Sequence, residues 1–179
     1  MIGLDILFWI FVIQFAIIGV IRGWAKELLV SFSVILGLFI ITVLEIFIPF
    51  IHESLVNGPV TPLFWLRAVI IAALVFFGYQ SPNIARLAAT NRFARERFQD
   101  ALLGLFLGAL NGYLIFGSIW FYLNQAAYPF PFITAPVPGS ASGDAALRLL
   151  TLLPPELLGT PAIYFAVAIA FAFVLVVFI

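Results

Sequence analysis

Long apolar stretches constrain this chain more than any other feature. Each is close to the roughly 20 residues that an α-helix needs to cross a hydrocarbon core about 30 Å thick. A chain inside lipid has to satisfy its own backbone polar groups, so these stretches predict helices. We therefore predict an all-α polytopic membrane protein with about five transmembrane helices plus short interfacial helices. The predicted spans are Leu4–Ile21, Leu28–Ile48, Leu63–Tyr79, Ala101–Leu123 and Pro161–Ile179.

Composition excludes a soluble globular domain. Hydrophobic residues make up 65% of the chain and charged residues 9%, against about 45–50% and about 25% in soluble proteins. Only Asp5, Glu45 and Arg67 fall inside the predicted spans, as expected where an ionised group at the bilayer centre costs at least about 2.5 kcal/mol. The net charge is zero and there is no dense basic tract, so the lipid bilayer is the expected partner and nucleic acid is not.

Three regions follow from this pattern. Residues 1–125 form a four-helix membrane region, residues 126–160 a loop, and residues 161–179 a C-terminal transmembrane helix. The loop opens on alternating aromatic residues and prolines from Tyr128 to Phe132, which suits the membrane interface. Residues 144–153 predict a short amphipathic helix, capped by Ser142 or Asp144 and stopped by Pro154.

Basic residues predict the orientation. The links after the first and third helices hold most of them, and the opposite side has only Arg67 and Arg148. Under the positive-inside rule these two links are cytoplasmic and both the N-terminus and the 126–160 loop are extracytoplasmic. The link from Gln80 to Asp100 also predicts a basic helix lying along the lipid surface. The cytoplasmic basic residues are Arg22, Lys26, Arg86, Arg92, Arg95 and Arg97.

Glycines spaced by four mark a helix contact. Gly104, Gly108 and Gly112 lie along one stripe of the fourth helix, and Gly19 and Gly23 form a second pair at the end of the first. Small residues at this spacing let a neighbouring backbone approach closely. The stripe predicts a tight helix packing, either within the chain or between copies.

Polar residues inside the spans predict where neighbours lie. Gln14 and Asn111 are near the middle of the bilayer, so both are expected to face protein or water, and they could hydrogen bond to each other. They can act as interhelical glue or line a polar conduit. Asp5, Glu45 and Arg67, at the outer helix ends, can form a charge cluster that neutralises the arginine.

No catalytic or metal-binding set emerges. Cysteine is absent and His52 is the single histidine, which excludes thiolate chemistry and a multi-histidine metal site. His52 could touch a pigment or haem of a partner, or be an ordinary interfacial histidine. Ser118 has no base within reach along its helix. We predict a non-enzymatic protein without cofactors.

Several motifs together resemble one family. The start Leu4-Asp5-Ile6, the turn Gly19…Arg22-Gly23…Glu27 and the glycine helix from Leu103 to Gly112 are similar to the colicin V production protein family (CvpA-like). The resemblance covers roughly residues 1–125. The chain departs from the family pattern at Ala101 and at Asn111, positions where basic residues are common, and in its fifth helix.

The resemblance implies a small bacterial inner-membrane protein that acts through helix–helix contacts in colicin V production or export and in envelope maintenance. Other membrane-protein subunits, or self-association, are then expected as partners. Two alternatives remain open. One is an accessory subunit of a larger bioenergetic or photosynthetic complex, and the other is a small oligomeric transporter or channel lined by Gln14 and Asn111.

The orientation can be tested with a cysteine introduced at Ser140. Because the chain has no cysteine of its own, an impermeant thiol reagent reports on this position alone. We expect labelling in intact cells, since the loop is predicted to be extracytoplasmic. Labelling that requires lysis would reverse the orientation.

Overall fold

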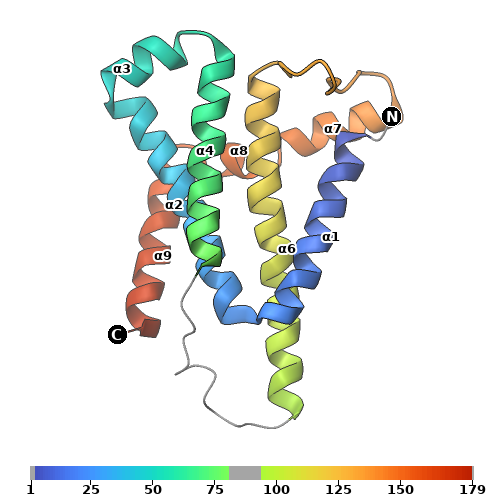
Figure 1. The fold of residues 1–179 in the computed structure, drawn as a ribbon, viewed down its shortest axis with the longest axis vertical. Coiled ribbons are helices and arrows are strands. Elements are labelled where there is room, and N and C mark those ends of the chain that lie inside the picture. The colour runs from blue at the N-terminus through green and yellow to red at the C-terminus, as the bar shows by residue number, and fades with distance from the viewer. Residues whose placement is uncertain (1–2, 81–93, 179) are drawn as a thin grey trace.

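The protein was analysed as a computed structural model, which describes residues 3–80 and 94–178 (Figure 1). This part of the chain is helical and contains no strand, which confirms the all-α prediction. The long helices are α1 (Leu4–Arg22), α2 (Trp24–Phe47), α4 (Val60–Tyr79), α6 (Ala94–Gln125) and α9 (Ala162–Phe178). The short ones are α3 (Pro49–Ile51), the π-helix η1 (His52–Val56), α7 (Ala141–Leu150) and α8 (Pro154–Leu157).

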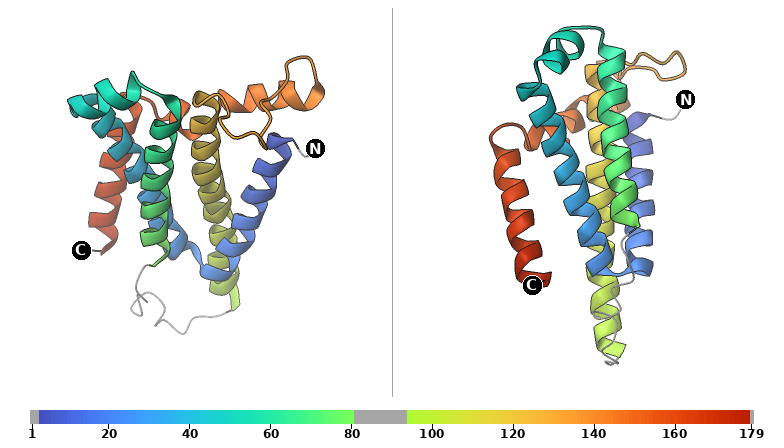
Figure 2. Two further views of the ribbon diagram at one scale, coloured as in Figure 1. Left: turned by 45° about the horizontal axis from the view of Figure 1, so that its top comes forward. Right: turned by 60° about the vertical axis from the view of Figure 1, so that its left-hand side comes forward.

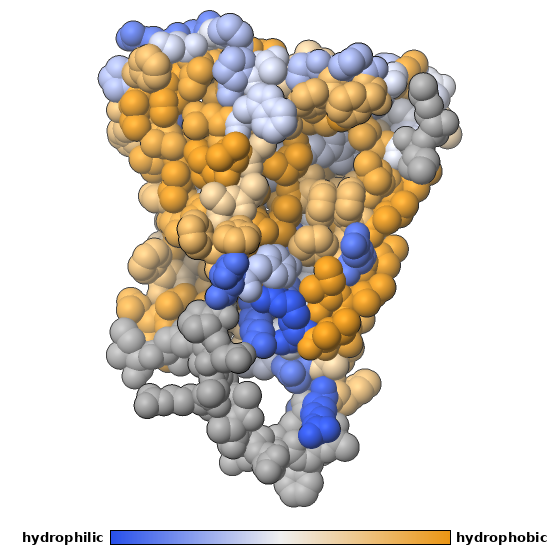
Figure 3. All heavy atoms as spheres, in the orientation of Figure 1, coloured by the Kyte–Doolittle hydropathy of each residue, from blue (hydrophilic) through white to orange (hydrophobic). Residues whose placement is uncertain are grey.

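Four helices, α1, α2, α4 and α6, are long and apolar enough to cross a membrane. A fifth span arises if α7, α8 and α9 are taken together, although α9 turns by 59° from the helices before it. Apolar side chains form a broad band across the face in Figure 3, with hydrophilic residues gathered above and below it. The described helices thus define a polytopic membrane protein with four to five spans.

The spans extend beyond the apolar stretches that predicted them. Helix α2 begins at Trp24 and α4 at Val60, while α6 begins at Ala94. Hydropathy predicts only the apolar part of a helix, so it does not predict first turns that are polar. The predicted surface helix is therefore wrong from Ala94 onward, where the chain already belongs to α6; the rest of that prediction, including Arg86 and Arg92, lies outside the described residues.

Helices α1 and α6 cross with their backbones in direct contact. A Cβ atom added to Gly19 would collide with the carbonyl oxygen of Gly104, and one added to Gly108 with that of Phe15. At Gly112 it would lie 2.9 Å from the Cα atom of Val12. The glycine stripe predicted from spacing thus forms a helix contact within this chain, and this contact buries the interacting faces of α1 and α6.

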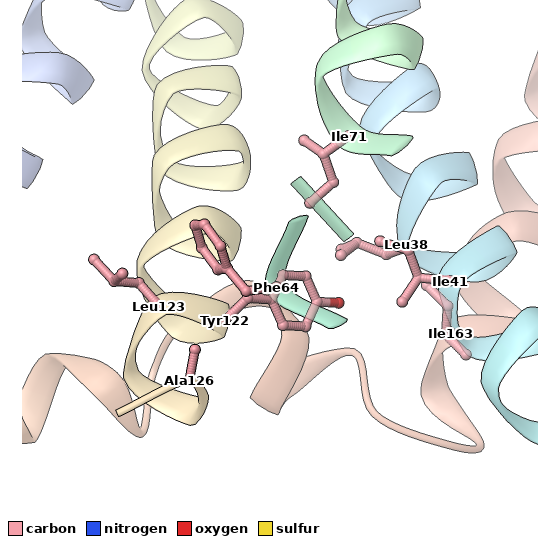
Figure 4. Packing of buried hydrophobic residues seen from close by; sticks show 8 residues of the cluster. All are labelled: Leu38, Ile41, Phe64, Ile71, Tyr122, Leu123, Ala126 and Ile163. Carbon is pink, nitrogen blue, oxygen red and sulfur yellow. The ribbon is translucent and has the colours of Figure 1, made fainter. Parts of the chain in front are cut away.

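Helix α2 occupies the middle of the bundle and contacts α4, α6 and α9. Its side chains Leu38 and Ile41 meet Ile71 of α4 and Ile163 of α9 in one buried cluster (Figure 4). Helix α9 stands at the edge of the bundle, beside α2 (Figure 2). The apolar cluster fixes α9 mainly through its first turn.

The segment after α6 covers one end of the bundle. Ser140 caps α7, its side chain accepting a hydrogen bond from the amide of Gly143 at 3.1 Å. The predicted caps Ser142 and Asp144 are therefore wrong, because α7 begins before them. Pro154 starts α8 rather than ending a helix, and it needs no amide donor in a first turn.

Aromatic side chains anchor the start of this segment. The ring of Phe130 lies 5.7 Å from Phe64 and 5.8 Å from Trp65, both on α4. Trp120 of α6 donates to the hydroxyl of Tyr128 at 3.2 Å. Burial raises the pKa of the Tyr128 phenol above its usual value.

Replacing Gly108 by alanine tests the α1–α6 crossing. The added methyl group must push the backbone of α1 away, so we expect a loss of about 1–3 kcal/mol in stability, measured by thermal unfolding of the purified protein in mild detergent. The matched control is Gly159→Ala, whose Cβ atom would have only ordinary contacts, the nearest at 3.5 Å. Equal melting temperatures for the two variants would contradict the crossing.

Candidate functional site

A buried polar cluster lies where the α1–α2 turn meets α6. We call it the Glu27 cluster, and it consists of Arg22, Glu27, Ser31, Tyr79 and Asn111. Glu27 is in the first turn of α2 and is fully buried, as is Asn111 near the middle of α6. An ionisable group buried inside a membrane protein is expensive and marks a candidate functional site.

Asn111 supplies hydrogen bonds to both the side chain and the backbone of Glu27. Its side-chain amide donates to Oε2 and to the backbone carbonyl of Glu27, both at 2.8 Å. Its own oxygen accepts from the hydroxyl of Ser31 at 2.7 Å. Glu27 and Ser31 are one helical turn apart and present their polar groups to the same side of α2. One amide therefore binds two successive turns of α2 to α6.

Arg22 neutralises the buried charge. Its guanidinium contacts Oε1 of Glu27 at 2.7 Å and donates to the backbone carbonyl of Tyr79 at 3.3 Å. It also lies 4.1 Å from the centre of the Tyr79 ring, a favourable cation–π arrangement. The hydroxyl of Tyr79 donates to Oε2 of Glu27 at 3.4 Å. The cluster thus joins α1, α2, α4 and α6.

The α1–α2 turn is built to bring these groups together. Gly23 has φ = +83°, a conformation that favours glycine. The carboxylate of Asp100, on α6, accepts from the amide of Trp24 at 3.2 Å. A Cβ atom on Gly23 would lie 2.8 Å from that carboxylate. Gly23 therefore both makes the turn and leaves room for Asp100.

A second charged group lies at the opposite end of the bundle. Arg67 of α4 is buried and contacts both carboxylate oxygens of Glu45 on α2, at 2.6 and 3.0 Å. Gln125 of α6 accepts from the same guanidinium at 2.5 Å, and the Tyr122 ring centre lies 4.6 Å from it. The charge cluster predicted from sequence therefore includes Glu45 and Arg67.

Asp5 does not join this group. Its carboxylate accepts from the hydroxyl of Ser142 at 2.8 Å instead, because α7 lies beside the start of α1 (Figure 1). Asp5 is thus a contact between α1 and the segment after α6. The prediction that all three outer charges cluster is wrong for this residue.

Gln14 is also placed differently from the prediction. Its side chain is exposed on the surface of α1, whereas Asn111 is fully buried against α2. Matching depth was not enough to pair them, because the glycine stripe brings a different face of α1 onto α6. The predicted Gln14–Asn111 hydrogen bond does not form.

The remaining predicted residues have ordinary surroundings. Ser118 is buried and donates to the carbonyl of Leu114 in its own helix at 2.6 Å. His52 is exposed, with Nδ1 3.1 Å from the carbonyl of Glu45. Lys26 and Arg97 are exposed at the end of the bundle where α1 joins α2.

The Glu27 cluster is a closed hydrogen-bonding network. Among the described residues, no buried side-chain nitrogen or oxygen lacks a partner, and no group of three or more His, Cys, Asp or Glu could hold a metal ion. Each oxygen of Glu27 already has a donor. The arrangement therefore suits a lock between helices, in which Arg22 is paired with Glu27.

Sequence reasoning missed most of this cluster. Sequence predicts that Asn111 faces protein or water, and it shows Glu27 only as part of a turn motif. Ser31 and Tyr79 carry no signal of their own. The four-residue spacing of Glu27 and Ser31, which places both on one face of the helix, is the available clue.

Comparison of the chain with models of known protein families, with curated proteins and with solved structures finds no match.

Asn111→Leu tests the cluster, because it removes two donors from Glu27 and leaves its carboxylate buried. Hydrogen bonds to charged groups contribute about 1.5–3 kcal/mol each, so we expect a loss of about 2–3 kcal/mol, measured by detergent unfolding or melting temperature. The matched control is Gln14→Leu, which changes an exposed intramembrane amide and is expected to leave stability unchanged. A similar effect of both substitutions would refute the assignment.

Proposed function

We propose that this chain is a non-enzymatic protein of the bacterial inner membrane, similar to colicin V production proteins. Its N-terminus lies outside, and it acts through helix–helix contacts with other membrane proteins in envelope maintenance or export. The membrane location is supported by the apolar spans. The orientation is supported by the distribution of basic residues.

The observation that carries the proposal is that the separated motifs of the resemblance meet in space. Gly19 of the turn motif contacts Gly104 of the glycine helix. Glu27, the last residue of the turn motif, hydrogen bonds to Asn111, which lies near the end of the Leu103–Gly112 motif. Two motifs more than eighty residues apart thus form one unit, as expected if they act together.

The departure at Asn111 is chemically mild in this setting. The family often has a basic residue there, and such a residue can donate to a buried carboxylate. Asn111 donates to Glu27 in the same way, while Arg22 supplies the positive charge. Asn111 can therefore supply the hydrogen bond to the carboxylate, although it does not supply the positive charge of a basic residue.

Partner contacts must use surfaces other than the glycine stripe, because the stripe is already buried between α1 and α6. The outer faces of both helices, and of α9, expose large apolar side chains. These faces are available to lipid or to neighbouring membrane proteins. Examples are Ile13, Ile17, Phe106, Phe165 and Ile169, each more than half exposed.

A transporter or channel is the second candidate, favoured by the fully buried carboxylate of Glu27. An ion flux in proteoliposomes that Glu27→Gln abolishes would support it. An accessory-subunit role predicts instead a stoichiometric complex that survives purification in mild detergent. The proposed function predicts neither flux nor a fixed stoichiometry.

Glu27→Gln tests the proposed function. In a bacterial strain lacking this chain, we expect a weakened envelope, measured as increased sensitivity to detergent in the growth medium, corrected by the wild-type gene but not by Glu27→Gln, because a neutral amide leaves Arg22 without its counter-charge. The control is Glu53→Gln, an exposed carboxylate in η1, which should restore resistance fully.

Membrane abundance of both variants must match the wild type, which separates loss of function from loss of protein. Full rescue by Glu27→Gln, or no envelope defect in the deletion strain, would overturn the proposal.

A further inference from the structure

A cleft lies between α2, α4 and α9, on the side of α2 away from α1. Its volume is about 370 Å³, and it is lined by residues of all three helices. Phe32 and Leu36 come from α2, Leu74 from α4, and Val167 and Val174 from α9. The cleft lies along two of the predicted spans, α2 and α4, and is therefore expected at the depth of the lipid tails.

The lining suits an apolar ligand. Ser33 is the polar side chain among the lining residues, and its hydroxyl already donates to the carbonyl of Leu29 at 2.9 Å. A polar ligand would lose its hydration in this cleft without gaining equivalent hydrogen bonds. The cleft is also partly open to the side of the bundle, where lipid tails are expected.

A basic side chain continues the wall of the cleft. Lys26, Leu29, Ser33 and Leu36 follow one another at spacings of three and four along α2, and so share one face of the helix. The last three line the cleft, and Lys26 is exposed at its end. Within the part of the chain that the structure describes, no hydrogen bond or ion pair holds Lys26.

We propose that the cleft binds a phospholipid, with one acyl chain between α2, α4 and α9 and the phosphate at Lys26. Charge favours a lipid as the occupant. Lys26 is exposed at the end of an apolar cleft that is partly open to the side of the bundle, and a lysine near the membrane surface attracts anionic lipid.

Selectivity for a bound lipid comes from the net negative charge of its headgroup. An acyl chain gains little by leaving other acyl chains, which are as apolar as the cleft. A lysine near the membrane surface, by contrast, attracts anionic lipid. The acyl chain thus sets the position of the lipid, and Lys26 sets the preference for its headgroup. This inference stands apart from the proposed function.

The test uses the full chain in vesicles of equal parts phosphatidylethanolamine and phosphatidylglycerol, with a trace of phosphatidylglycerol carrying a diazirine in its acyl chain. After illumination, mass spectrometry maps the cross-linked residues. We expect adducts concentrated on the cleft-lining residues rather than spread over the lipid-facing surface. Adducts spread evenly over exposed apolar residues would overturn the proposal.

Matched variants sharpen the result. Val174→Trp fills the cleft and should abolish the concentrated adducts, whereas Val176→Trp, at an exposed position of the same helix, should leave them unchanged. Lys26→Gln should lower them about fivefold and Lys26→Arg should retain them, since the attraction depends on the charge. Arg97→Gln is the control for loss of an exposed basic residue.

Unchanged adducts in Val174→Trp, or an equal loss in Arg97→Gln and Lys26→Gln, would refute the site. Cleft-lining residues that carry no adducts while a second copy of the chain or another membrane protein co-purifies would assign the cleft to a helix and likewise refute the lipid. Native mass spectrometry of each variant, showing the same folded charge-state distribution, separates these outcomes from misfolding.

Discussion

A buried carboxylate in a membrane protein needs a complete set of partners, and in this chain that need ties the helices together. Glu27 has no exposed surface and takes its hydrogen bonds from α1, α4 and α6. Removing any one of these donors leaves charge in a medium that solvates it poorly. The cluster therefore specifies how the helices must be arranged, in addition to any stability that it supplies.

Helix α6 carries both the close backbone contact and the polar contact. Its Gly108 lacks a side chain, so α1 approaches closely, and its Asn111 hydrogen bonds to Glu27 on α2. The glycine stripe and the polar network are thus parts of one arrangement. Packing brings the helices together, and the polar groups select which faces meet.

Sequence was a good guide to the fold because lipid imposes a simple rule on the chain. Apolar length predicted the long helices, and glycine spacing predicted the contact that α1 and α6 make. Helix ends were less predictable, since the polar first turns of α2 and α6 lie beyond the apolar stretches. Hydropathy carries no information about where a helix continues outside the lipid.

The candidate site was only partly predictable, for a different reason. Depth along a helix can be read from sequence, but rotation about its axis depends on tertiary packing. Gln14 and Asn111 share a depth, yet only Asn111 faces the protein. Tyr79 belongs to the cluster through a tertiary contact with Glu27, which no local sequence pattern predicts. The resemblance pointed to Glu27, and the geometry supplied its partners.

Helix α6 is continuous from Ala94 to Gln125, and it contributes to both charged clusters. Asn111, near the middle of the helix, hydrogen bonds to Glu27, and Gln125, its last residue, hydrogen bonds to Arg67. At about 1.5 Å per residue these two side chains are roughly 21 Å apart along a single stiff rod. Because one helix carries both amides, a tilt or piston movement of α6 shifts the hydrogen-bond partners of Glu27 and Arg67 together.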